Sequence, residues 1–538
     1  MLKGNFCIQL GSEMLRFSSQ RNGWTATLFE FGTIGLLDEL LAAGRASASG
    51  ILSEGSFDDL KEQVVDRVLK DQGLGNEGER GALRNLLPRK ATEFKPSSYK
   101  YKALEGLLPS LRSKYLENWR KELSVTAYHS WPAVKKGDRA AQPLEVASRL
   151  TAFLLEEGVS LDYIVKWLDY RVTHTSKSIH LADLIAQMEE LYRRGKKTVE
   201  VLVILEQTVT PVLWSSLNLL SATSVREWIS TNSFELPSEQ TLRLHGGLVV
   251  SIEEWDIPGS LVRVGSLLSR IRRRAQMNGW KAPQFSNSAW IKGIPKEQRI
   301  PRENPMGGIL VGTQVDSRAL LLPSSENRLE VALEFVEAAA TAGGASAAGM
   351  LWAALESLFA APGDPIRLEV VSRAADIGLL AFVRFDLKNA LAITMEHEKL
   401  SPIVQKMKAE PVGERLASFE AFVRAGDFSS IKQLRVRTHL EHTAALITVE
   451  GLAARRAQLQ KSLRSLYRHR NFVLHGGVND APLLNSVLRG GYPLVCAIVE
   501  KYGRSGQAAG EDPYTFATSS YMKIERYLWD SNQALGAI

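Results

Sequence analysis

Hydrophobic residues follow two different periods along the chain, and the change between them predicts its organisation. From Leu144 to about residue 194, apolar side chains recur every three to four positions, as on one face of a helix. They then run almost without interruption from Thr198 to Leu205, where the sequence reads TVEVLVIL. A run so rich in β-branched residues predicts a buried strand. Further strands are predicted at Gly247–Ile252, Ala289–Ile291 and Ile309–Val315, with an arginine-rich helix at Ser260–Met277.

Beyond residue 325 the strand pattern fades and helical segments follow one another. Glycines and prolines, such as Gly343-Gly344 and Gly476-Gly477, separate these segments and predict helix ends. A series of amphipathic helices with short connections is typical of a helical bundle. The predicted helices are Asn327–Ala340, Ala345–Ala360, Ile366–Ala381, Glu414–Ala425, Leu440–His475 and Pro482–Tyr502.

The start of the chain has a weaker pattern. Leu36–Leu41 and Phe57–Leu69 predict short amphipathic helices, whereas Gly73–Gly81 and Pro132–Pro143 resemble loops. We therefore expect an α+β protein, with a mixed α/β N-terminal portion followed by an all-α helical bundle. The expected sections are an N-terminal mixed region (1–140), an α/β domain (141–324), a helical domain (325–505) and a weakly helical tail (506–538).

Composition narrows the class of protein. The chain has 538 residues, of which 45% are hydrophobic and 23% charged, as in ordinary globular proteins. It contains no apolar run of the ~20 residues that a membrane span needs, and its start lacks the apolar core of a secretion signal. Two cysteines, Cys7 and Cys496, are too few for a disulfide framework or a cysteine metal site. We expect a cytoplasmic protein with no membrane partner, no metal and no cofactor.

The positive charge is unevenly distributed, and its position suggests an anionic partner. The net charge of +7 is small for this length. No acidic residue lies between Glu450 and Asp480, however, and cationic residues are frequent there. Because they lead directly into the motif described next, we interpret them as RNA-binding. The expected RNA-binding residues are Arg455, Arg456, Lys461, Arg464 and Arg468. A second basic group, Arg270–Arg274, is interpreted as a solvated helix face.

The motif itself is Arg470-Asn471-x3-His475, followed by two glycines. RNA is cut without a metal when one group removes the proton of the ribose 2′-hydroxyl and another stabilises the negative charge that develops on the oxygens of the phosphorane. An imidazole, which titrates near pH ~6.5, suits the first task. A guanidinium, always charged and able to hold two phosphate oxygens, suits the second. Asn471 lies one turn before His475 and is placed to orient it or to bind RNA. Gly476 is expected to end the helix in a left-handed cap.

Helix geometry leaves the identity of the catalytic arginine open. Arg470 and His475 are five positions apart, so on a regular helix they diverge by about 140°. Arg468 lies on the same helical stripe as His475 and is the more natural partner within one chain. Arg470 serves if the last turn is distorted, or if two chains build the site together. The bare spacing is also weak evidence, because arginine and histidine at such a separation recur by chance about twice in a chain of this composition.

Arg470-Asn471-Phe472-Val473-Leu474-His475-Gly476-Gly477 resembles the signature of HEPN-domain ribonucleases, and its asparagine variant is similar to that of the Apea-like HEPN family. The segment around Leu351–Phe359 also resembles an early HEPN helix. The resemblance covers about residues 325–505. It implies a helical bundle that forms a homodimer, a composite site made by two motifs, and metal-independent cleavage of RNA. It favours Arg470 over Arg468. It also implies a role in antiviral defence by abortive infection or in a toxin system, with a phage-derived trigger or an antitoxin as a possible partner.

Two further interpretations stay open. Glu356 lies among Trp352, Leu355 and Phe359, where a carboxylate is unusual, and it is a candidate to support a motif arginine by a salt bridge. The alternative to an endoribonuclease is a non-catalytic HEPN-like module for dimerisation or RNA binding, with the active function in the N-terminal portion.

Overall fold

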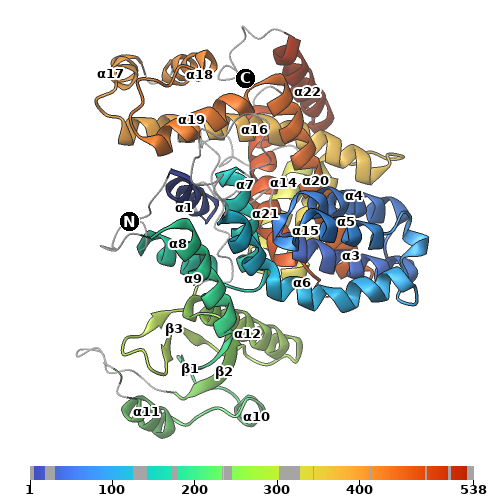
Figure 1. Ribbon diagram of the computed structural model, residues 1–538. Coiled ribbons are helices and arrows are strands. Elements are labelled where there is room, and N and C mark those ends of the chain that lie inside the picture. The colour runs from blue at the N-terminus through green and yellow to red at the C-terminus, as the bar shows by residue number, and fades with distance from the viewer. Residues whose placement is uncertain are drawn as a thin grey trace. The chain divides into compact units, whose positions relative to one another are not determined.

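The computed structural model shows a mostly helical chain with one antiparallel sheet among the described residues, which confirms the α+β class (Figure 1). It describes residues 5–18, 31–124, 142–170, 179–232, 234, 245–301, 327–342, 344–411, 414–478, 481–506 and 510–529. The chain forms two compact units. The larger contains Met1–Glu156, Leu168–Gln187 and Gly308–Ile538, and the smaller contains Glu157–Trp167 and Met188–Gly307. This grouping is coarser than the four sections expected from the sequence, because 1–140 and 325–505 belong to one unit.

The smaller unit holds the sheet. The strands are β1 (Lys197–Leu205), β2 (Gly247–Glu254), β3 (Phe285–Ile291) and the short β4 (Gln298–Arg299). Their order is β2-β1-β3-β4, and every neighbouring pair is antiparallel, with Val201 opposite both Val250 and Ile291. The first three strands confirm the sequence predictions. The strand predicted at Ile309–Val315 lies outside the described residues.

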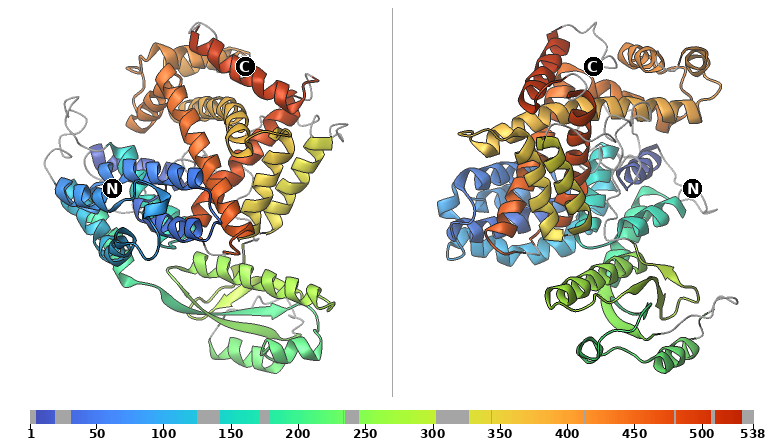
Figure 2. Two further views of the ribbon diagram at one scale, coloured as in Figure 1. Left: turned by 90° about the vertical axis from the view of Figure 1, so that its right-hand side faces the viewer. Right: turned by 180° about the vertical axis from the view of Figure 1, so that it is seen from behind.

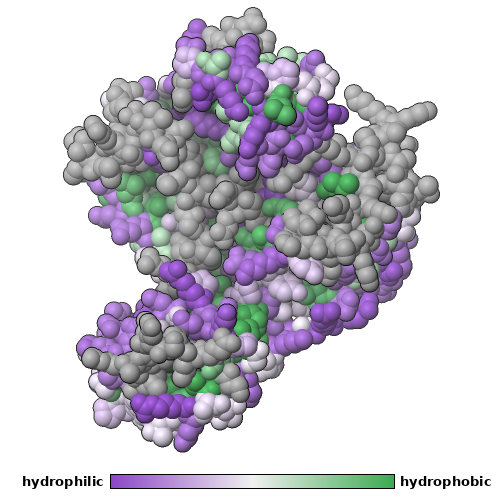
Figure 3. All heavy atoms as spheres, turned by 90° about the vertical axis from the view of Figure 1, so that its left-hand side faces the viewer, coloured by the Kyte–Doolittle hydropathy of each residue, from purple (hydrophilic) through white to green (hydrophobic). Residues whose placement is uncertain are grey.

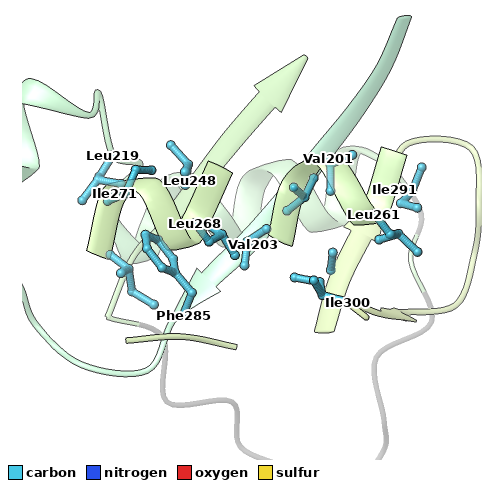
Figure 4. Close-up of a cluster of buried hydrophobic side chains, with 13 residues drawn as sticks. Val201, Val203, Leu219, Leu248, Leu261, Leu268, Ile271, Phe285, Ile291 and Ile300 are labelled. Carbon is cyan, nitrogen blue, oxygen red and sulfur yellow. The ribbon is translucent and has the colours of Figure 1, made fainter. Parts of the chain in front are cut away.

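Both faces of β1 are covered, which explains its uninterrupted apolar sequence. Successive side chains of a strand point to opposite faces. Val201, Val203 and Leu205 join a cluster with Leu261 and other residues of α12 (Ile257–Met277). Figure 4 shows Val201, Val203 and Leu261 within this cluster. Leu202 and Ile204 face the other way and pack with α11 (Ala222–Thr231). The smaller unit also contains α10 (Pro211–Ser216), whereas α8 (Leu161–Asp169) and α9 (Leu181–Arg194) each contain residues of both units.

The described part of the first 156 residues is helical, so the mixed region expected there is corrected. Its helices are α1 (Asn5–Ser18), α3 (Thr33–Ala48), α4 (Glu54–Lys70), α5 (Glu77–Leu86), α6 (Tyr99–Leu123) and α7 (Pro143–Glu156), with short 3₁₀ turns at Gln72–Leu74 and Ala91–Glu93. The loop predicted at Gly73–Gly81 contains the start of α5. Asn76 caps this helix by accepting from Glu79 N, while the Glu79 carboxylate accepts from Asn76 N. Most of the loop predicted at Pro132–Pro143 lies outside the described residues.

The C-terminal half is helical throughout its described residues, and the predicted series is confirmed in outline. Its helices are α14 (Asn327–Ala342), α15 (Gly344–Phe359), α16 (Ile366–His397), α17 (Pro402–Ala409), α18 (Arg415–Ala425), α19 (Leu434–Leu446), α20 (Val449–Leu474), α21 (Leu484–Lys501) and α22 (Pro513–Trp529), with a π-helical turn at Tyr502–Gly506. The helix predicted at Leu440–His475 is two helices. Thr448 separates them, because its hydroxyl accepts from Gly451 N and starts α20.

The segment expected as a weakly helical tail does contain a helix, α22, and this helix packs against α16. The Tyr527 hydroxyl donates to the carbonyl of Ile447 at 3.1 Å, and the Arg424 guanidinium lies 4.5 Å from the centre of its ring. Aromatic side chains that bury their rings and satisfy their hydroxyls hold a helix in place. The segment is therefore part of the larger unit.

Helices α15, α16, α20 and α21 pack against one another (Figures 1 and 2). Gly378 allows α16 and α21 to approach closely, because a Cβ there would lie 3.2 Å from Leu494 Cδ1. The N-terminal helices belong to the same unit: α4 packs on α20, and α7 on α21. Within the described ranges no helix is both long and apolar enough to cross a membrane. The hydrophobic residues coloured in Figure 3 form small separate areas among hydrophilic ones.

Candidate active site

The predicted motif lies at the C-terminal end of α20. The helix ends at Leu474, and His475 caps it with φ −99° and ψ −28°. The left-handed residue is Gly477, at φ +62°, and not Gly476 as expected. Gly476 has a different role: a Cβ there would lie 2.7 Å from the carbonyl oxygen of Phe472. The turn that exposes His475 therefore needs both glycines, one for conformation and one for space.

Arg470 and His475 are in contact within one chain. Arg470 Nη1 lies 2.9 Å from His475 Nε2. The expected divergence of about 140° holds only for the directions in which two side chains leave a regular helix. It does not separate these two groups, because His475 follows the last helical residue and the long arginine side chain reaches across the helix end. A composite site between two chains is not needed to bring an arginine to this histidine.

This contact fixes the arrangement of protons in the ligand-free site. A guanidinium has donors only, so His475 Nε2 must accept, and the ring proton of a neutral imidazole is then on Nδ1. Arg470 Nη1 also donates to Asn471 Oδ1 at 3.0 Å. Asn471 is buried, Arg470 is partly buried and His475 is exposed. The three motif residues thus form one chain of contacts that leads from the protein interior to solvent.

Arg468, the rival partner of His475 and an expected RNA-binding residue, lies inside the protein. Its side chain is only 1% exposed, and its Nε donates to Glu39 Oε1 of α3 at 2.5 Å. Its Nη2 donates to Ser465 Oγ at 3.1 Å. Glu39 is fully buried. Arg468 is therefore not available to RNA in this structure, because its side chain is buried and paired with Glu39 of α3.

His469, which the sequence did not single out, extends this buried group. Its Nδ1 lies 3.0 Å from the carbonyl oxygen of Ser465, and its Nε2 lies 2.7 Å from that of Pro482. The Glu39 carboxylate is 3.9 Å from the same Nε2. Glu39 thus faces two basic side chains, adjacent in sequence, just before the motif. A buried acid on α3 gives no periodic signal that would connect it with α20.

The other basic residues of α20 are mostly engaged by the protein itself. Arg456 pairs with Asp376 at 2.6 Å, and Arg464 with Asp59 at 3.4 Å. The Arg455 guanidinium lies 5.0 Å from the centre of the Phe382 ring. Lys461 is exposed, and the described residues give it no ion pair. Of the residues expected to bind RNA, Lys461 is the one that the structure places on the surface without such a contact.

Glu356 contacts a tryptophan and not a motif arginine among the described residues. Its Oε1 accepts from Trp352 Nε1 at 2.6 Å, one turn earlier on α15. The Trp352 ring lies 4.9 Å from that of Tyr467 on α20. Glu356 therefore fixes the tryptophan that packs against the motif helix, which is a more indirect support than the expected salt bridge.

Comparison with known proteins gives no independent indication of what this site does. No family model, no curated protein and no solved structure matches the chain.

Proposed function

We propose that the chain is a metal-independent endoribonuclease of the HEPN type, with Arg470 and His475 as its catalytic residues. The observation that carries the proposal is the 2.9 Å contact between Arg470 Nη1 and His475 Nε2 at an exposed helix end. Phosphate transesterification needs a base and a cation for the phosphoryl oxygens. The contact places these two groups next to each other at an accessible position.

The contact also suggests how RNA starts the reaction. In the free protein, the lone pair of His475 Nε2 is occupied by Arg470. A phosphate group competes for the guanidinium through stronger, charge-assisted bonds, and the imidazole nitrogen is then free to take the proton of the ribose 2′-hydroxyl. The 2′-oxygen attacks phosphorus, the bond to the 5′-oxygen breaks, and that oxygen takes up a proton. The products are a 2′,3′-cyclic phosphate and a 5′-hydroxyl.

Asn471 positions Arg470 in this scheme, because its buried side-chain oxygen holds the guanidinium at the helix end. Lys461 and any arginine released from its internal pair add phosphate contacts along α20. The leaving oxygen needs an acid as well as the nucleophile a base, and a homodimer that joins two helix ends provides a second His475. We include this dimer in the proposal for that reason, together with a cytoplasmic role in antiviral defence or a toxin system.

The decisive experiment is incubation of the purified full chain with RNA in the presence of EDTA. The proposal expects cleavage that chelation does not reduce and that His475→Ala abolishes, while Lys406→Ala, at an exposed position of α17, retains most of the activity. Cleavage that disappears with the metal would contradict the mechanism.

One observation favours the alternative, a non-catalytic helical module. Arg456, Arg464 and Arg468 each pair with a carboxylate of the same chain, so α20 serves to assemble the larger unit. On this alternative the protein shows no RNA cleavage in the same assay, and Arg470→Ala changes neither its stability nor its assembly.

A further inference from the structure

A second group of basic side chains gathers at the other end of the helix pair α20–α21. Arg384 and Lys388 lie one turn apart on α16, and Lys501 is the last residue of α21. Arg504 follows in the π-helical turn, and Lys523 comes from α22. These elements pack against one another. Lys388 feels the charges of Arg384 and Arg504, and Lys501 feels those of Arg384, Lys388 and Lys523. We call these five residues the α16–α21 basic cluster.

The cluster is unfavourable in the protein without a ligand. Burial, together with the charges of Arg384 and Arg504, lowers the pKa of Lys388 to about 8. Burial and the charges of Arg384, Lys523 and Lys388 likewise lower the pKa of Lys501 to about 8. Both lysines still carry most of their charge at neutral pH. Partly buried like charges are rare unless something of opposite charge is bound beside them.

The described residues supply opposite charge to Arg504 but form no ion pair with Arg384 or Lys388. Glu500 pairs with Arg504 at 2.8 Å, and both side chains are largely buried. Within the described ranges, Arg384 and Lys388 have no ion pair, and Arg384 Nε is buried without a hydrogen-bond partner. The carbonyl end of α21 stabilises cations near it, which accounts for Lys501 and Arg504. It does not account for Arg384 and Lys388, which lie well inside α16.

The cluster is separate from the proposed catalytic site. His475 precedes α21, whereas Lys501 ends it, and the 18 residues of this helix span roughly 27 Å. The two sites therefore lie at opposite ends of α21. An occupant of the basic cluster does not reach Arg470 or His475 unless it is about as long as the helix.

We propose that the α16–α21 basic cluster binds a small anion that carries two or more phosphate groups, such as the polyphosphate of a nucleotide. Arginine grips phosphate oxygens in pairs, and lysine adds a compact charge at short range. A small anion fits better than an RNA backbone, because Lys388 and Lys501 are recessed from the surface. Two or more phosphates match the cluster, because Arg384 and Lys388 lie one turn apart on α16 and neither has an ion pair among the described residues.

Inorganic triphosphate tests this on the full chain, by calorimetric titration and by thermal unfolding at constant ionic strength. We expect saturable binding and a Tm that rises with triphosphate concentration, because a ligand that binds only the folded state stabilises it. Lys388→Met should weaken binding at least about tenfold. The same variant should raise the Tm of the ligand-free protein, because it removes a partly buried charge. Lys406→Met, which changes an exposed lysine of α17, is the matched control and should alter neither quantity.

These measurements do not involve RNA cleavage, so their outcome is independent of the proposed function. Absence of saturable binding overturns the proposal, as does a Lys388→Met protein that binds triphosphate like the unmodified chain. A single-stranded RNA with a 5′-hydroxyl that displaces triphosphate would assign the cluster to an RNA backbone and overturn the assignment to a small anion. Displacement by ATP, but not by adenosine, supports a nucleotide polyphosphate.

Discussion

The buried pair of Glu39 and Arg468 allows a quantitative test of how the motif helix is held. Glu39→Met leaves the Arg468 guanidinium, only 1% exposed, without its carboxylate. Removal of one partner of a buried ion pair costs about 3–5 kcal/mol, a large part of the ~5–15 kcal/mol that stabilises a typical protein. Arg468→Met should cost somewhat less, because His469 Nε2 still lies 3.9 Å from the Glu39 carboxylate.

The double variant should be much less destabilised than either single one. Two methionines fill a similar volume and leave no buried charge, and such replacements are often neutral or stabilising. The present pair is also imperfect, because Glu39 Oε2 and Arg468 Nη1 have no hydrogen-bond partner among the described residues. We expect the double variant within about 1 kcal/mol of the unmodified protein, so that the two substitutions deviate from additivity by at least ~3 kcal/mol.

Urea denaturation of the four proteins measures these free energies, and hydrogen exchange of peptides from α3 and α20 shows whether the loss is local. A double variant destabilised by the sum of the single effects would refute the reasoning. On the proposed function the double variant retains RNA cleavage, because Arg470 and not Arg468 is catalytic. A stable double variant without activity would transfer the catalytic role to Arg468.

Three further predictions follow from the two ends of α20 and α21. Arg470→Ala and His475→Ala should each lower RNA cleavage by about 10²–10⁴-fold with unchanged circular dichroism, because both groups act at an exposed helix end; activity retained by either variant contradicts the proposed site. If the site is shared in a dimer, light scattering should give twice the mass of one chain. Mixing Arg470→Ala with His475→Ala should then restore part of the activity, because each chain supplies the residue that the other lacks. Without a ligand, Lys388→Met should have the higher free energy of unfolding near pH 8. Its difference from the unmodified chain should shrink by ~1 kcal/mol as the pH rises from about 8 to 10.5. The unfolded lysine keeps its proton in this window while the folded one, beside Arg384, Lys501 and Arg504, loses it; an unchanged gap contradicts the lowered pKa.

Local patterns in the sequence predicted those elements whose burial follows a regular period. The apolar run of β1 is explained by its two covered faces. A capping, glycine or proline residue marks the beginning or end of five helices: α12, α14, α15, α18 and α21. The break between α19 and α20 was missed, because a threonine cap inside an otherwise helical pattern is a weak signal. The helix α22 was underestimated, because its stability comes from contacts of Tyr527 with residues far away in sequence.

The candidate site was predictable in its residues but not in its surroundings. The motif residues lie close together in sequence, so Arg470, Asn471 and His475 were found by spacing and residue type. Their contact was not, because helix geometry gives the direction of a side chain at its base and not the reach of an arginine. The role of Arg468 depends on Glu39, which is 429 residues away in the chain. No local pattern reports such a partner, and the arginine was therefore assigned to the surface.

The pair of Glu39 and Arg468 also sets a limit on how this chain can be divided, in the laboratory or in evolution. A fragment that starts near residue 325 contains the complete motif, yet it exposes the part of α20 against which α4 packs and leaves Arg468 without its carboxylate on α3. Recombination could therefore not transfer the motif helix alone to another protein. Glu39 on the distant helix α3 would have to be transferred together with α20. A related protein with different N-terminal helices would need another acid in its place, or an uncharged residue in place of Arg468.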